Sequence, residues 1–154
     1  MQRCNNIYNH PVYIKRTEII AEKEKDRIFC PHNLAHALDV ARIGYIMILE
    51  QGLDIDKELF YSAALLHDAG RYSDKPHNES GADLAKRIMP ECGFSDLETE
   101  CVSNAIRGHR QNAQADIFSK ILYDADKQSR LCFCCNAQDE CYWEQEKRNH
   151  TISI

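Results

Sequence analysis

The sequence predicts an all-α protein, a compact single-domain bundle of about six helices. Apolar residues recur at helical three- and four-residue steps through most of the 154 residues, and the alternation typical of a half-buried strand is absent. Hydrophobic residues make up 44% of the chain, enough for one domain with its own core. No repeat, low-complexity tract or long linker divides the sequence.

Three helices are expected in the first half of the chain. Residues 12–27 form an amphipathic segment rich in Glu and Lys. A second helix, 32–51, begins just after a proline, which the first turn of a helix tolerates, and Gly52 is its expected stop. Asp56 is expected to cap a third helix that ends at about Ala69-Gly70.

The second half contains three more helical segments after a loop at 71–76. One covers residues 77–92 and stops near Gly93. Ser95 to Glu98 has the form of a capping box and opens a helix to about His109. The last helix is expected over 116–130, before a Cys-rich tail at 132–154 that packs on the same domain, 1–131.

Side chains of the metal-ligand type occur on three of these apolar helices. His67 and Asp68 follow the apolar run 63–66, and burying an ionised carboxylate without a partner costs several kcal/mol. A divalent metal is a common partner for such a pair. His36 lies on the preceding helix and Asp126 on the last one, where Asp124 competes for the same role.

The ordered set His36, His67-Asp68 and Asp126 resembles the HD superfamily of metal-dependent phosphohydrolases. The segment from Leu65 to Arg71 is similar to the family's pattern of two leucines, His-Asp, a small residue, Gly and a basic residue. The resemblance covers residues 30–130. It implies that the four side chains converge on a metal and that Asp126, rather than Asp124, is the ligand.

Within that superfamily the motifs are most similar to the symmetrical dinucleoside-tetraphosphate hydrolases. His77 and His109 stand where such proteins carry histidines for a second metal, and residues 125–130 are similar to their "Ala-Asp…Arg" ending. After His109 the chain has Arg110-Gln111-Asn112, where those enzymes usually have a threonine-and-glycine turn.

The resemblance implies one or two divalent ions, drawn from Fe, Mn, Zn, Co or Ni, since mixed imidazole and carboxylate ligands suit these metals. We expect Asp68 to bridge two metals or to orient the attacking water, with Arg71 and Lys127 stabilising the developing charge. Further contacts to the substrate are expected from the remaining nearby basic side chains: His32, Arg107, Arg110 and Arg130.

The predicted function is hydrolysis of a small phosphorylated substrate, such as a nucleotide, by metal-activated water. The alternatives are a catalytically weak HD protein that senses metal and nucleotide, and a helical interaction module with a zinc-bound tail. The net charge of −5 argues against long nucleic acid as a partner. Without an apolar export signal or membrane span, we expect a cytoplasmic protein, and the sequence is compatible with a homodimer.

Four of the eight cysteines fall in the tail, at positions 132, 134, 135 and 141. In a reducing compartment we expect free thiols that pack as small apolar groups and anchor the tail. Cys132 and Cys135 also have the two-residue gap of a zinc knuckle, but no second pair follows. That alternative requires Cys141 and one ligand distant in the sequence.

Overall fold

The computed structural model describes residues 1–108 and 116–152, and these contain seven α-helices and no strand. In chain order the helices are α1 (Gln2–Tyr8), α2 (Pro11–Lys23), α3 (Leu34–Glu50), α4 (Lys57–Leu66), α5 (His77–Ile88), α6 (Asp96–Gly108) and α7 (Ile117–Gln128). Short 3₁₀ turns occur at Pro90–Cys92, Cys132–Cys134 and Gln145–Lys147. The all-α prediction is confirmed.

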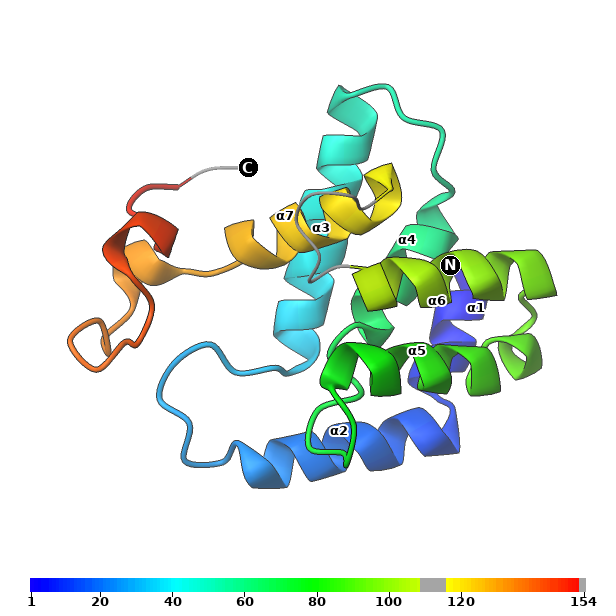
Figure 1. The fold of residues 1–154 in the computed structure, drawn as a ribbon, viewed down its shortest axis with the longest axis horizontal. Coiled ribbons are helices and arrows are strands. Elements are labelled where there is room, and N and C mark those ends of the chain that lie inside the picture. The colour runs from blue at the N-terminus through cyan, green and yellow to red at the C-terminus, as the bar shows by residue number, and fades with distance from the viewer. Residues whose placement is uncertain (109–115, 153–154) are drawn as a thin grey trace.

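Helix α3 stands at the centre and packs against α4 and α7, while α5 lies along α6 on the other side of α4 (Figure 1). The core is continuous through these helices and includes Val40 of α3, Leu66 of α4 and Leu122 of α7. Gly44 lets α3 approach closely, because a Cβ there would lie 2.2 Å from a ring carbon of Phe60. The three helices that carry the predicted ligands are therefore in direct contact.

Several predicted helix ends are confirmed by their capping bonds. Asp56 accepts a hydrogen bond from the backbone N–H of Leu59. Ser95 and Glu98 form the reciprocal pair of a capping box, with the Glu98 carboxylate accepting from the Ser95 N–H at 2.8 Å. Gly52 has φ +62° just after α3, the left-handed conformation in which glycine ends a helix.

Other boundaries were predicted wrongly. Helix α3 begins at Leu34, not at residue 32, because the side chain of Asn33 caps it and the His32 N–H bonds to a carboxylate of Glu24 instead. Helix α5 ends at Ile88, before Pro90 and not at residue 92, since proline has no N–H to continue the ladder. The short helix α1 was not expected at all.

The tail, residues 131–152, lies beyond the end of α7, at the left of Figure 1. The side chain of Asn149 donates hydrogen bonds to the backbone carbonyls of Lys127, Gln128 and Arg130 and so joins the tail to that helix end. No helix in the described ranges is both long and apolar enough to cross a bilayer.

Candidate metal centre

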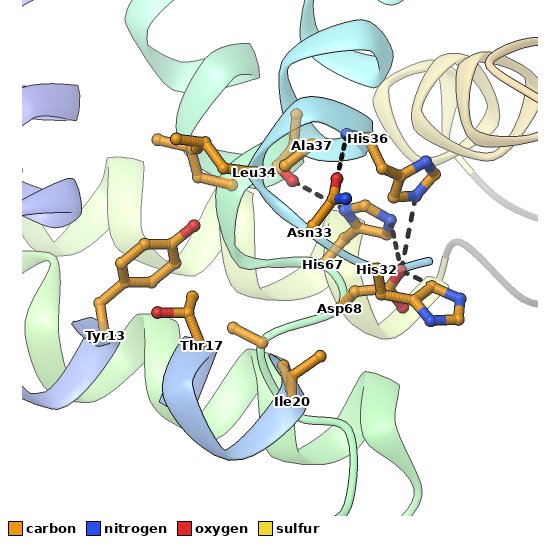
Figure 2. A pocket seen from close by; sticks show the side chains of 13 residues that line it. Tyr13, Thr17, Ile20, His32, Asn33, Leu34, His36, Ala37, His67 and Asp68 are labelled. Atoms are coloured by element: carbon orange, nitrogen blue, oxygen red, sulfur yellow. Dashed lines mark hydrogen bonds and ion pairs between the residues drawn. The ribbon is translucent and has the colours of Figure 1, made fainter. Parts of the chain in front are cut away.

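Four side chains from three structural elements meet at the N-terminal end of α3. Nε2 of His36 lies 3.5 Å from Oδ2 of Asp68 and 3.3 Å from Oδ1 of Asp126. Nε2 of His67 lies 3.2 Å from the same oxygen of Asp68 and 3.9 Å from that of Asp126. Figure 2 shows the rings of His36 and His67 turned toward Asp68.

Hydrogen bonds on the far nitrogen fix the orientation of both imidazoles. The Nδ1–H of His67 donates to the carbonyl of Ala64, one turn earlier in α4, at 2.7 Å. The hydroxyl of Ser129 gives its one proton to the Asp126 carbonyl, so its oxygen is left to accept from Nδ1 of His36 at 3.3 Å. Each ring thus keeps a proton on Nδ1 and turns Nε2 toward the two carboxylates, so Nε2 is the nitrogen that a metal would take.

The electrostatic state of the cluster follows from burial and charge together. Burial alone would lower the pKa of His36, but the carboxylates of Asp126 and Asp68 outweigh it and raise the pKa to about 9. Burial would raise the pKa of Asp68, yet the imidazoles of His67 and His36 and the guanidinium of Arg71 hold it well below its usual range. Asp126 is likewise held low, by His36, His67 and Lys127. The carboxylates are charged.

The donor set fits a divalent metal. One atom each of His36, His67 and Asp68 lie within 4.8 Å of one another, and Asp126 adds a fourth donor. Nε2 of His36 is buried and has no hydrogen-bond partner among the described residues, an arrangement that costs free energy unless another group binds it. Two imidazole nitrogens and two carboxylates are ligands of Fe, Mn, Co and Zn sites.

Gly70 positions the next residue of the site. A Cβ at Gly70 would lie 2.2 Å from the backbone oxygen of His77 and 2.4 Å from the nitrogen of Gly81. The absent side chain lets α5 begin directly against the turn after α4. Nε2 of His77 consequently lies 3.6 Å from Oδ1 of Asp68, the oxygen that faces away from His36.

The cationic residues divide into two groups. Arg71 donates to Oδ1 of Asp68 at 2.9 Å, and Lys127 pairs with Asp126, so both lie beside the candidate ligands. Arg107 instead pairs with Glu79 of α5 at 3.0 Å, and the guanidinium of Arg130 lies 3.9 Å from the ring centre of Trp143 in the tail. Asp124 pairs with Lys120 on another face of α7. His109 and Arg110 lie outside the described residues.

Sequence reasoning missed Glu24, which orients His32. The Glu24 carboxylate accepts from the backbone N–H of His32 at 2.8 Å and from Tyr72 at 2.9 Å, and lies 2.6 Å from Nδ1 of His32. Nε2 of His32 is left facing the centre, 3.9 Å from Asp68. Glu24 is only 8% exposed although its helix is rich in charged residues, and no motif distinguishes it from its neighbours in the sequence.

Comparison with known proteins agrees with this geometry. The HD domain model matches residues 33–131, which include all four converging side chains. The chain belongs to the HD domain family. A crystal structure of a predicted HD superfamily hydrolase from an uncultured Thermotogales bacterium matches 96% of this chain and 87% of that chain, with a TM-score of 0.62 and 28% identity.

Three relatives of this HD protein differ in how much of their own length the chain spans. An uncharacterized protein of Clostridium beijerinckii is 40% identical over 99% of both chains. Ribonuclease Y of Acetivibrio thermocellus is 33% identical over 60% of this chain, which spans 16% of that protein. A bifunctional uridylyltransferase/uridylyl-removing enzyme of Rhodopseudomonas palustris is 38% identical over 34% of this chain, which spans 6% of that protein.

Proposed function

We propose that this HD protein hydrolyses a small phosphate ester, a nucleotide or a related compound, with a divalent metal held by His36, His67, Asp68 and Asp126. The observation that carries the proposal is the pair of buried, charged carboxylates facing Nε2 of His36, which has no hydrogen-bond partner among the described residues. Membership of the HD family supports a metal-dependent phosphohydrolase at the superfamily level.

Each residue has a separate role in this proposal. A divalent ion in the centre would supply hydroxide at neutral pH and neutralise charge on the phosphoryl oxygens. Ser129 and the Ala64 carbonyl keep both imidazoles in the tautomer that binds a cation. Arg71 and Lys127 sit beside the carboxylates, where they can turn to the negative charge that develops on the ester oxygens.

His32 is proposed to contact the substrate rather than the metal. Its Nδ1 faces Glu24, so Nε2 is the atom left for a phosphate oxygen. A hollow of about 420 Å³ adjoins His32 and is lined partly by Ile20, Ala21 and Leu34. Because Glu18 and Glu24 also line it, the hollow suits the organic part of an ester better than its phosphate.

A second metal is the finer part of the proposal. It would take Oδ1 of Asp68 and His77, with His109 as a further ligand from outside the described residues. Arg71 already donates to that oxygen, so a second ion has to displace the guanidinium. Elemental analysis of Mn²⁺-loaded protein, with any zinc counted separately, decides this point: two equivalents of manganese that fall to one in His77→Ala support the second site, and a single equivalent in both proteins opposes it.

The test of the function is turnover of a phosphate-ester panel with Mn, Fe or Co added. The panel contains nucleoside monophosphates, a cyclic nucleotide, a dinucleotide and symmetrical dinucleoside tetraphosphates. Two relatives are named as a ribonuclease and a uridylyl-removing enzyme, and the flanking motifs are similar to those of tetraphosphate hydrolases. We expect metal-dependent release of product that Asp68→Asn abolishes. Nucleotide binding without turnover would favour a sensor instead.

A further inference from the structure

The tail of the chain is folded without an apolar core. Ala137 is the one buried residue among positions 131–152, and the aromatic side chain of Tyr142 is 64% exposed. A segment this small cannot be held in one conformation by apolar burial, and natural units of this kind use disulfides or a metal ion as a staple. Hydrogen bonds from Arg148 and Gln138 to backbone carbonyls of the tail hold its turns together.

The cysteines of the tail differ in exposure according to their position. Cys132, Cys135 and Cys141 are half-buried, whereas Cys134, between the first two, is exposed. The N–H of Cys135 donates to the carbonyl of Cys132 at 3.3 Å, which closes the two residues of a Cys-x-x-Cys pair into one turn. The side-chain amide of Gln138 donates to the carbonyl of Cys132, and the backbone carbonyl of Gln138 accepts from the N–H of Cys141. The third cysteine is thus tied to the same turn.

A fourth cysteine, Cys30, lies in the loop between α2 and α3. The ring of Phe29 meets the ring of Tyr142 edge-on, with centroids 5.5 Å apart, and this contact joins the residue before Cys30 to the residue after Cys141. Burial raises the pKa of the half-buried Cys30; nearby Arg130 lowers it, and the neighbouring thiols of Cys132 and Cys141 raise it. Arg27 donates to the carbonyls of Phe29 and Cys30 and holds this loop in place.

We propose that Cys30, Cys132, Cys135 and Cys141 bind one structural Zn²⁺ through four sulfurs. Cys30 is then the distant ligand that the zinc-knuckle spacing of the tail lacks. The four sulfurs do not yet lie within 4.8 Å of one another; among the described residues only the ligand atoms of His36, His67 and Asp68 do. The thiols must therefore rotate inward to reach Zn–S distances of about 2.3 Å. Binding releases the thiol protons and adds folding free energy.

The position of the zinc site gives it a role beyond the tail. Cys30 lies two residues before His32, and Cys132 follows the Asp126 helix by four residues. An ion that joins these cysteines clamps the entry to α3 against the exit of α7, the two helices that bring His36 and Asp126 together. The site is independent of the proposed hydrolysis and is tested without a substrate.

Cobalt substitution separates the two metal centres. Co²⁺ at the histidine and aspartate ligands has only nitrogen and oxygen donors, whereas Co²⁺ at the cysteines gives the intense sulfur-to-metal charge-transfer absorption of a thiolate site. We expect that absorption at one equivalent in the wild type and in the matched control Cys134→Ser. Cys30→Ser and Cys141→Ser should lose it while their helical circular dichroism and their binding of Co²⁺ at the other centre are retained.

Two further measurements bear on the site. Protein purified without chelator should contain zinc, and all eight thiols should titrate once this protein is unfolded. In the folded protein, four of the thiols should react with a thiol reagent only after a chelator has removed the zinc. Loss of the charge-transfer absorption in Cys134→Ser, its persistence in Cys30→Ser, or a disulfide between any two of the four cysteines would each overturn the proposal.

Discussion

At the scale of single residues, the centre is organised by what lies behind the ligands. The Nδ1 atoms of His36 and His67 face the Ser129 hydroxyl and the Ala64 carbonyl, and the Nε2 atoms of both rings are turned toward Asp68 and Asp126. The two carboxylates carry charge in a buried place, which is costly for Asp68 and Asp126 unless cations surround them. In the described structure the imidazoles, Arg71 and Lys127 provide that charge.

Replacing Asp68 by Ala should remove the metal bound at the histidine and aspartate centre, counted as manganese after Mn²⁺ loading and apart from any zinc. The carboxylate is within 3.5 Å of both imidazole nitrogens, so the remaining donors lack their central anion. A metal present at 100 times its dissociation constant stabilises the wild type by about 2.7 kcal/mol, and the variant should gain none of this. Elemental analysis and the metal-induced shift in Tm measure both effects.

The matched control for this change is Asp83→Ala. It removes a half-exposed carboxylate of α5 that pairs with Lys75 in the preceding loop. It should keep full metal content. Full metal occupancy in the Asp68→Ala protein would show that the assignment of the centre is wrong.

His32→Ala should lower kcat/KM and leave the metal content unchanged. The loss of one hydrogen bond to a charged phosphate corresponds to about 1.5–3 kcal/mol, or roughly 10- to 100-fold. Glu24→Gln should give a smaller loss, because it weakens the orientation of His32 without removing the ring. A drop in bound metal in His32→Ala would instead identify His32 as a ligand.

The sequence was sufficient to predict which candidate ligands converge, but not which residues orient them. The order and spacing of His36, His67-Asp68 and Asp126 can be recognised in one amino-acid sequence without a structure. Glu24 and Ser129 act through contacts made only after α2, α3 and α7 have packed, and their own surroundings in the sequence are ordinary. The partners of Arg107 and Arg130 could not be predicted for the same reason.

At the scale of helices, small residues set how closely the ligand-bearing elements approach. Gly44 brings α3 onto α4 and α7, and Gly70 brings the start of α5 onto the turn that carries Asp68. The helix ends followed from caps visible in the sequence, as at Asp56 and Ser95. The start of α3 did not, since it depends on Glu24 taking the N–H of His32.

Gly44→Ala should destabilise the fold by about 1–3 kcal/mol, the usual cost of overpacking a core. Alanine favours a helix over glycine by about 1 kcal/mol, but its Cβ would lie 2.2 Å from Cζ of Phe60 and 3.1 Å from Cβ of Ala125. Urea unfolding of the metal-free protein measures the change.

A double-mutant cycle with Phe60→Leu tests this cause. Leucine lacks the ring atoms that meet the new Cβ, so the two substitutions together should cost less than the sum of the single changes. Strict additivity would show that the cost of Gly44→Ala does not come from Phe60.

At the scale of the whole molecule, the N-terminal helix α1 is tied to the domain by charge rather than by the core alone. Arg3 of α1 pairs with Glu58 of α4 at 2.8 Å and with Glu98 of α6 at 2.7 Å, and its guanidinium lies over the ring of Phe94. Helix α1 is too short to be stable by itself. These ion pairs and the burial of Ile7 explain why it forms, and the ion pairs join residues more than 50 positions apart in the sequence.

The same network should make stability depend on pH in acid. The α-amino group of Met1 and the guanidinium of Arg3 lower the pKa of Glu58 to about 2. A carboxylate with a depressed pKa in the folded state contributes stability above its unfolded pKa of about 4.3, and this contribution is lost as the pH falls toward 2. Since the ion pairs are partly open to solvent, we expect a contribution on the order of 1 kcal/mol.

The measurement is the difference in unfolding free energy between the wild type and Glu58→Gln, taken from urea titrations of metal-free protein at pH 6 and near pH 2. Comparing the two proteins at each pH removes the effect of other groups that titrate in both, including Asp68 and Asp126. The wild type should be the more stable at pH 6, and the difference should shrink in acid. Glu100→Gln, which removes an exposed partner of Lys86, serves as the control and should show a smaller change. A Glu58→Gln difference that stays constant between the two pH values would mean that the carboxylate's charge does not stabilise the attachment of α1.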